Sequence, residues 1–189
     1  LKEGLTSPLF APAMAMGQAV RPLLPAVLKA KVPERVAADP RGTPTRSHAR
    51  RMLMLAGCVQ PAMSPNINAA TARVLDAAGI EVVTPSGAGC CGAIRAHLGD
   101  QDGGLADMRR NIDAWWPLVE GGAVEAIVMN ASGCGVTVKE YGHHLAGDPA
   151  YADKAARISA LTRDLSELLP MLVPVLKPKL AAAAQAGQL

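Results

Sequence analysis

The chain has 189 residues, a formal net charge of +3 and 50% hydrophobic residues, which is enough for one domain with a substantial core. So small a net charge gives no indication of nucleic-acid binding. Only 3% of the residues are aromatic, so we expect a core of aliphatic side chains and methionine. The first residues lack the pattern of a secretory signal, and their apolar run is too short to span a membrane.

Residues 1–48 are predicted to form a helical connector followed by a proline-rich linker. Four prolines interrupt residues 1–32, which are otherwise rich in Leu, Met and Ala, and this pattern predicts short helices that end near the prolines. We expect the apolar surface of these helices to pack on a partner domain. Residues 33–48 contain three prolines and little periodicity, as is typical of a linker.

Strands and helices alternate after this linker. Residues 51–59 are predicted to form a buried strand, residues 64–79 a helix and residues 80–85 a second strand. Ser64 is a favourable N-cap for the helix, and Pro65 suits its first position. The apolar face of the helix is expected to comprise Ile67, Ala70, Val74, Leu75 and Ala78.

Two more helices and a third strand complete the predicted domain. We expect a helix over residues 104–120, a strand over 124–132 and a last helix over 152–169, with a frayed, proline-broken tail at 171–189 that leads toward a second cysteine-rich domain. The alternation predicts parallel pairing, and hence an α/β three-layer domain at residues 49–170 with a mostly parallel sheet in Rossmann-like layering. No dinucleotide or phosphate-binding glycine motif is present, which disfavours a nucleotide enzyme.

The four cysteines lie close to the ends of the predicted strands. Cys58 lies at the end of the first strand, Cys90 and Cys91 follow the second, and Cys134 follows the third. Parallel strands joined by right-handed crossovers bring these ends to one edge of the sheet, where open α/β sheets place their sites. The sequence therefore predicts that the four thiols converge.

Each cysteine also has a glycine beside it or one residue away. Glycine lets a backbone turn sharply and approach closely, and the amides it exposes can point at sulfur. Four thiolates suit either tetrahedral zinc or an iron–sulfur cluster. The predicted metal ligands are Cys58, Cys90, Cys91 and Cys134, and the predicted site-shaping residues are Gly57, Gly89, Gly92, Gly133 and Gly135.

Three other interpretations of the cysteines stay open from the residues alone. Free cysteine is often a small buried hydrophobic residue. Disulfides are a second interpretation, although they are uncommon in the cytoplasm, which is the compartment expected for a chain without a signal. The third is a catalytic or redox thiol with His97, His143 or His144 as its base. Surface positions for these histidines, and helix packing for Trp115 and Trp116, are the simpler expectations.

Four segments resemble one protein family: GCVQ at 57–60, GAGCCGAIRAHLGD at 87–100, NIDAWW at 111–116 and ASGCG at 131–135. They are similar to the first cysteine-rich, or CCG, domain of the iron–sulfur subunit of glycolate oxidase. That subunit belongs to a wider group, which includes a subunit of heterodisulfide reductase and relatives of lactate and glycerol-3-phosphate dehydrogenases. The resemblance covers roughly residues 51 to 169.

The resemblance implies electron transfer from a flavin subunit, which oxidises glycolate to glyoxylate, toward the membrane quinone pool. It implies a 4Fe–4S cluster, with zinc as the alternative, and no acid–base catalysis by this chain alone. The expected partners are flavin-binding subunits and, within the same subunit, a ferredoxin-like part and a second CCG domain. Neither nucleic acid nor a direct membrane span is expected. The expected localisation is cytoplasmic, with peripheral attachment to the inner face of the membrane through the complex as an alternative.

The sequence also departs from the family pattern. It contains one CCG segment rather than two and lacks the ferredoxin motif C-x-x-C-x-x-C-x-x-x-C-P, so it is expected to be an internal fragment of a longer subunit. Thr137 stands where the wider group often has a further cysteine, which leaves four candidate ligands rather than five. Two other functions stay open: a structural zinc-binding docking module and a thiol redox enzyme that resembles the heterodisulfide reductases.

Overall fold

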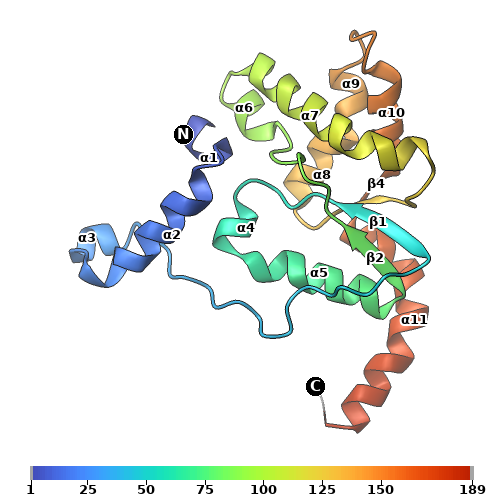
Figure 1. The fold of residues 1–189 in the computed structure, drawn as a ribbon, viewed down its shortest axis with the longest axis horizontal. Coiled ribbons are helices and arrows are strands. Elements are labelled where there is room, and N and C mark those ends of the chain that lie inside the picture. Colours follow the sequence, from blue (N-terminus) through green and yellow to red (C-terminus); the bar gives the residue numbers. More distant parts are fainter. Residues whose placement is uncertain (1, 188–189) are drawn as a thin grey trace.

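The computed structural model describes residues 2–187 and places a four-stranded parallel sheet at the centre of the chain (Figure 1). The strands are β1 (Arg50–Met54), β2 (Ile80–Val83), β3 (Ile127–Met129) and β4 (Thr162–Asp164), in the order β2-β1-β3-β4. Leu53 in β1 pairs with Val83 of β2 on one side and with Ile127 of β3 on the other. All three pairings are parallel, so the predicted α/β sheet is confirmed.

Helices follow each of the first three strands and cover both faces of the sheet. The helices of the domain are α4 (Gln60–Met63), α5 (Pro65–Ala77), α6 (Ala93–His97), α7 (Gln101–Glu120), α8 (Ser132–Lys139), α9 (Tyr141–His144), α10 (Ala152–Leu161) and α11 (Leu165–Gln185). Because β1 pairs with β2 on one side and with β3 on the other, the strand order reverses at β1. The crevice beyond the carboxyl ends of β1 and β3 is therefore the switch point at which such sheets bind ligands.

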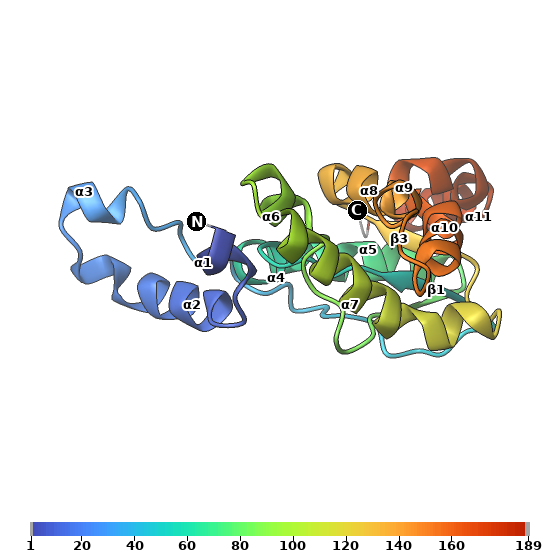
Figure 2. The same cartoon turned by 90° about the horizontal axis from the view of Figure 1, so that it is seen from above.

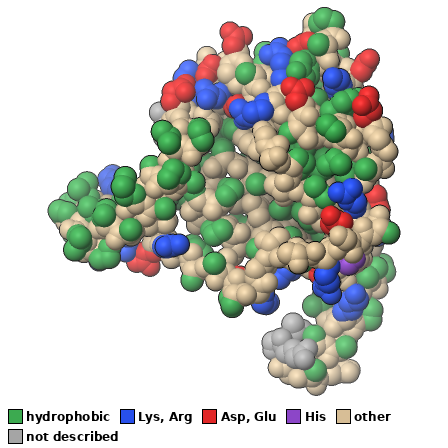
Figure 3. Space-filling model, viewed as in Figure 1, with side chains coloured by type: hydrophobic (Ala, Val, Ile, Leu, Met, Phe, Trp, Pro, Cys, Tyr) green, Lys and Arg blue, Asp and Glu red, His purple; other side chains and the backbone are tan. Residues whose placement is uncertain are grey.

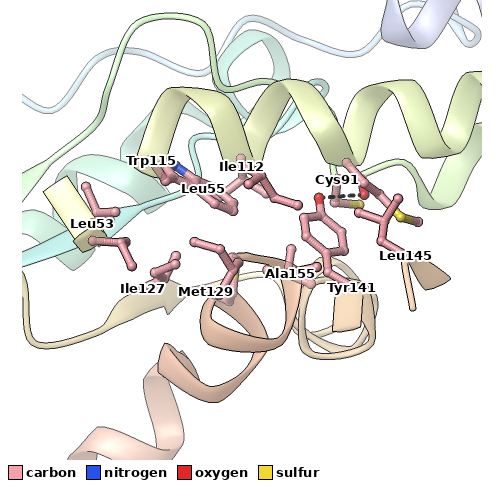
Figure 4. Packing of buried hydrophobic residues seen from close by; sticks show 14 of the residues in the cluster. Leu53, Leu55, Cys91, Ile112, Trp115, Ile127, Met129, Tyr141, Leu145 and Ala155 are labelled. Atoms are coloured by element: carbon pink, nitrogen blue, oxygen red, sulfur yellow. Dashed lines mark hydrogen bonds between the residues drawn. The ribbon is translucent and has the colours of Figure 1, made fainter. Parts of the chain in front are cut away.

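One face of the sheet packs against α7, α9 and α10. Successive strand residues point to opposite faces, so Leu53 and Leu55 lie on this face together with Ile127 and Met129 (Figure 4). The fully buried side chain of Trp115 in α7 is the largest in this core. The apolar face predicted for residues 104–120 is confirmed, with Met108, Ile112, Trp115 and Val119 buried and Leu105 partly buried.

The opposite face packs against α5 and α11. Met52 of β1 and Ile80 of β2 contact Leu75 of α5, while Leu168 and Leu172 of α11 cover the other part of this core. Burial on both faces explains why residues 52–54 of β1 and all of β3 are continuous apolar runs rather than alternating ones. The three-layer arrangement is thus confirmed.

The helix α5 begins where the sequence predicts, but its buried face differs from the expected one. Ser64 occupies the N-cap position and Pro65 the first turn, although the Ser64 side chain makes no capping hydrogen bond. Leu75 is fully buried, whereas Ile67 and Val74 are 44% and 38% exposed. The reason is that α5 turns Thr71 and Leu75 toward the sheet, which leaves Ile67 at a cavity described below.

The single helix predicted for residues 152–169 is wrong, because β4 divides it into α10 and α11. Residues 162–164 pair with β3 as an edge strand. The Asp164 side chain then accepts a hydrogen bond from the Ser166 amide, and the Glu167 side chain accepts one from the Asp164 amide, which forms a capping box for α11. The apolar pattern in the sequence reads as one helix because Ile158 of α10 and Leu168 of α11 are both buried, although β4 lies between them.

Most of the tail predicted to fray belongs to α11, which runs to Gln185 and extends away from the domain (Figure 1), while residues 188–189 of that tail lie outside the described residues. Pro170, Pro174 and Pro178 lie inside this helix. They recur every fourth residue, so they share one face, and all three are exposed. The missing amide hydrogen bonds therefore lie on the solvent side, while Leu172 on another face is buried against the sheet.

The N-terminal residues form an arm of short helices that projects from the domain (Figures 1 and 2). Its elements are α1 (Lys2–Thr6), α2 (Phe10–Val20), η1 (Arg21–Leu23) and α3 (Ala26–Lys29), followed by an irregular segment. Leu9 and Leu23 are 72% and 86% exposed, and apolar side chains cover the arm (Figure 3). Ion pairs from Lys2 to Asp100 at 3.3 Å and from Arg95 to Glu3 at 3.1 Å join α1 to the domain. Among residues 2–187, no helix combines the length and the apolar character needed to cross a membrane.

Candidate functional site

Three segments at the carboxyl edge of the sheet carry the four cysteines. Cys58 lies between β1 and α4, Cys90 and Cys91 lie between β2 and α6, and Cys134 lies in the first turn of α8, directly after β3. All four are free thiols. Cys90 and Cys91 are each 2% exposed, and Cys58 and Cys134 are partly exposed. The structure therefore places all four at one edge, as the parallel sheet predicts.

The four thiols interact in a row, in the order Cys58, Cys90, Cys91, Cys134. Hydrogen bonds from the Cys58 and Cys91 thiols lower the pKa of Cys90 to about 2, and the amides of Gly92 and Ile94 contribute further. A hydrogen bond from Cys91 likewise lowers the pKa of Cys134. Donating these bonds raises the pKa of Cys58 and of Cys91, and burial raises both further. The hydrogen bonds thus favour the thiolate form at Cys90 and Cys134 over that at Cys58 and Cys91.

The donor set fits a metal that prefers sulfur, but the thiols are not yet arranged around one centre. Four cysteine sulfurs, two of them with a lowered pKa, are the ligand chemistry of zinc and of iron–sulfur clusters. Within residues 2–187, however, no three His, Cys, Asp or Glu side chains form a group that could hold a metal ion as they stand. Ligation would therefore require the side chains of the cysteines to turn toward a common point.

A cavity of about 400 Å³ lies beside the row at the switch point of the sheet. Cys58 and Cys134 form part of its wall. The side chain of Gln60 donates to Asn68 at 2.6 Å and to Asn130 at 2.9 Å, which links the loop after β1 to the end of β3. The remaining walls are mostly apolar and include Leu55, Val59, Met63, Ile67, Ile94 and Met129.

Two fully buried polar side chains hold the backbone of the cysteine loop. Asn111 of α7 donates to the carbonyl of Cys90 at 2.7 Å and accepts from the amide of Gly89 at 2.8 Å. The hydroxyl of Tyr141 in α9 donates to the carbonyl of Cys91 at 2.9 Å (Figure 4) and accepts from Asn111 at 3.0 Å. Both side chains are 0% exposed, and burial raises the pKa of Tyr141 beyond its usual range.

Gly92 permits the closest backbone contact at the site. Its φ of 96° is a conformation that residues with side chains rarely adopt, and a Cβ there would lie 2.7 Å from the carbonyl oxygen of Gly104 in α7. A Cβ on Gly104 would in turn lie 3.2 Å from the Gly92 oxygen. The two glycines therefore let α7 approach the cysteine loop.

The other predicted site-shaping glycines differ in their local reasons. Gly57 has a φ of 81°, and a Cβ on Gly135 would lie 3.3 Å from the Cβ of Met129. A Cβ on Gly89 would lie 3.3 Å from the guanidinium of Arg110. Gly133 faces open space, so the structure gives no steric reason for glycine at that position.

Arginines surround a buried carboxylate next to the loop. Arg110 contacts Asp107 at 2.9 Å, and Arg95 lies 3.3 Å from the other carboxylate oxygen. Burial raises the pKa of Asp107, and the charge of Cys90 adds to this effect. The Arg110 guanidinium, which packs over Gly89, is therefore held in place by Asp107 of the same helix. This arrangement places positive charge close to the cysteine loop.

The histidines and tryptophans lie where the simpler interpretation places them. His97 and His144 are exposed and line a different cavity of about 450 Å³, whose wall includes none of the four cysteines. His143 is also exposed. Trp115 is a core residue, and Trp116 packs under the ammonium group of Lys154 at 5.6 Å.

Sequence reasoning missed Asn111, Tyr141, Gly104 and the carboxylate of Asp107. Asn111 lies among the buried residues of α7, and the other residues used to predict that buried face are apolar. A polar residue on an apolar helix face is the one signal that could have identified Asn111 as functional. Tyr141 lies 50 residues from Cys91, and nothing local connects the two.

Comparisons with known proteins identify the cysteine-rich segment. Residues 52–139 match the family described as CCG, cysteine-rich domain. The chain is 54% identical over 175 residues to the glycolate oxidase iron–sulfur subunit of Escherichia coli K12, which covers 89% of this chain and 42% of that protein. It is 34% identical over 120 residues to a probable glycolate oxidase iron–sulfur subunit of Bacillus subtilis 168, which covers 64% of this chain and 26% of that protein.

A third relative has a different name. Lactate utilization protein A of Bacillus licheniformis is 31% identical over 112 residues, which covers 59% of this chain and 44% of that protein. The chain thus spans less than half the length of each of these three relatives. No solved structure matches it. Residues 52–139 therefore match the CCG cysteine-rich domain, in a chain that is similar over most of its length to a glycolate oxidase iron–sulfur subunit.

Proposed function

We propose that this chain binds an iron–sulfur cluster of the 4Fe–4S type and relays electrons within a subunit of a complex that oxidises glycolate or a related 2-hydroxy acid. The observation that carries this proposal is the row of four thiols, gathered from three strand ends at one edge of the sheet. The similarity to proteins named as glycolate oxidase iron–sulfur subunits supports it.

The residues that would hold the cluster are the four cysteines. When bound, an iron–sulfur cluster supplies a site that accepts and donates electrons. Hydrogen bonds lower the pKa of Cys90 and of Cys134, which favours their ligating thiolate form, and the amides of Gly92 and Ile94 direct hydrogen bonds at Cys90. Such hydrogen bonds to sulfur are among the factors that set the reduction potential of a cluster.

Four ligands, rather than five, are what the chain offers. Thr137 lies on α8 where a further cysteine occurs in the wider group, and its hydroxyl donates to the carbonyl of Gly133 at 3.2 Å. The hydroxyl is thus engaged within the helix. This argues for a cluster held by four cysteines over one that needs a fifth thiolate.

The apolar cavity at Cys58 and Cys134 gives the sulfurs space into which to turn. Cys58 and Cys134 would hold the cluster from the wall of this cavity, and Cys90 and Cys91, which are buried, would hold it from the protein interior. We assign no acid–base step on glycolate to this chain. Oxidation of the 2-hydroxy acid belongs, in this proposal, to a flavin-binding partner in a cytoplasmic complex, and any membrane attachment belongs to partners as well.

Metal analysis of the full chain, purified without oxygen, tests the proposal. We expect iron and acid-labile sulfide in comparable amounts, visible absorption of a cluster and an EPR signal in one redox state. Each of Cys58→Ser, Cys90→Ser, Cys91→Ser and Cys134→Ser should lower the iron content, whereas Gly133→Ala, which changes no thiol and meets open space, should not.

Two outcomes would contradict the proposal. Stoichiometric zinc without iron would instead indicate a structural zinc module, which four cysteine thiolates also suit. Metal-free protein with a redox-titratable thiol pair would indicate a thiol redox enzyme, since each cysteine with a lowered pKa is hydrogen-bonded to a cysteine with a raised pKa.

A further inference from the structure

The peptide groups of the cysteine loop are polarised. Their carbonyl oxygens point toward Asn111 and Tyr141, which donate to Cys90 and to Cys91 respectively. The amides that follow the two cysteines bond to sulfur instead: those of Gly92 and Ile94 bond to Cys90, and that of Ala93 bonds to Cys91. The carbonyls of Cys90 and Cys91 therefore face the protein interior, while the amides after them face the thiols.

The planarity of the peptide bond connects these two sides. The carbonyl of Cys91 and the amide of Gly92 belong to one planar, trans peptide group, in which the C=O and N–H bonds point in opposite directions. Holding the Cys91 oxygen toward the Tyr141 hydroxyl at 2.9 Å therefore directs the Gly92 amide away from Tyr141, toward the Cys90 sulfur.

The Tyr141 hydrogen bond constrains a peptide that glycine leaves easy to rotate. Gly92 has a φ of 96° and no side chain, so the backbone can rotate there more easily than at other residues. The two holding side chains come from α7 and α9, and both are fully buried. Asn111 and Tyr141 are also bonded to each other at 3.0 Å, which fixes each with respect to the other.

We infer that Tyr141, which Asn111 holds in place, is a positioning residue that aims the amide of Gly92 at the Cys90 sulfur and thereby raises the reduction potential of the centre bound there. The effect on the potential rests on the function proposed above. The aiming of the amides does not, because it follows from hydrogen bonds within the chain itself.

Tyr141→Phe in the full chain is the first test, since it removes one hydroxyl and keeps the ring that fills the core. We expect iron and sulfide contents equal to those of the unmodified chain and a more negative midpoint potential, because hydrogen bonds to sulfur help to set the potentials of such clusters. In the metal-free chain, the Gly92 amide should exchange its proton up to roughly tenfold faster, as expected for loss of one buried hydrogen bond.

Tyr151→Phe is the matched control. The Tyr151 hydroxyl donates to Asp113 on the surface at 2.9 Å, so its loss should change neither the potential nor the exchange of Gly92. Should Tyr141→Phe fold poorly, Asn111→Ser supplies the second variant, with faster exchange expected at Gly89, whose amide bonds to Asn111.

An unchanged potential together with unchanged exchange at Gly92 in Tyr141→Phe would overturn the inference. A chain that binds no iron would refute the proposed function and, with it, the effect on the potential. In that case amide exchange still decides whether Tyr141 and Asn111 aim the loop, so the two failures are distinguishable.

Discussion

Gly92→Ala tests the close contact between the cysteine loop and α7. The new Cβ would lie 2.7 Å from the carbonyl oxygen of Gly104 and 3.3 Å from Cγ of Met108, at a φ of 96°. The first neighbour is backbone within a helix of 20 residues, so it cannot rotate away as a side chain would. The substitution must therefore strain residue 92, displace the loop from α7, or both.

The expected magnitude follows from these two terms. A side chain in a left-handed conformation costs about 1–2 kcal/mol. Crowding an already packed contact costs a further 1–3 kcal/mol or so. Together they lower the free energy of unfolding by about 2–5 kcal/mol, which for a chain of this size is a fall of about 4–20 °C in Tm.

Urea and thermal unfolding of the metal-free chain, followed by circular dichroism under anaerobic conditions, measure this effect. Gly133→Ala is the control, because Gly133 also adjoins a site cysteine but a Cβ there meets open space in α8. We expect Gly133→Ala to change stability by no more than about 1 kcal/mol, in the stabilising direction, because alanine favours the helix. Equal stabilities of the two variants would refute the argument from backbone contact at Gly92.

Two further predictions concern the domain outside the site. Leu75→Ala should lower the free energy of unfolding by about 2–5 kcal/mol, because Leu75 is fully buried between α5 and the sheet. Val74→Ala is the control and should cost far less stability, since Val74 is 38% exposed. Similar losses for the two variants in urea titrations would contradict the assigned buried face. Hydrogen bonds from Arg46 and then His48 lower the pKa of Asp76 below its ordinary 3.8, so its contribution to stability is present above about pH 4 and is lost as the pH falls through the folded-state pKa. Thermal unfolding between pH 6 and pH 3 should therefore show a weaker acid dependence for Asp76→Asn than for the unmodified chain, and parallel curves would count against this pair.

The sequence was most informative where its patterns are local. The apolar runs around Leu53 and Ile127 are strands, and the periodicity through Met108, Ile112 and Trp115 is a helix with that face buried. The order of strands and helices was sufficient to predict a parallel sheet, because parallel strands require crossover connections. Convergence of the cysteines followed from that sheet.

Local sequence patterns were less reliable where more than one secondary structure fits the same spacing of apolar residues or prolines. Ile158 and Leu168 are both buried, so the pattern reads as one helix, yet β4 lies between them and pairs with β3. The prolines of α11 predicted a broken tail, but their four-residue spacing places them on one exposed side of a continuous helix. In both cases the deciding contacts are with residues distant in the sequence.

The amino-acid sequence by itself determined the layered α/β fold, the four thiols and the edge of the sheet at which they meet, because these depend on periodicity and on the geometry of parallel strands. Only the tertiary structure decided which residues hold the cysteine loop. Asn111 and Tyr141 reach it from separate helices, and Gly104 admits it by backbone contact. The adjacent cysteines are therefore specified locally, but the direction of their amides and carbonyls depends on side chains that are 20 to 50 residues away, whose role appears only when the chain has folded.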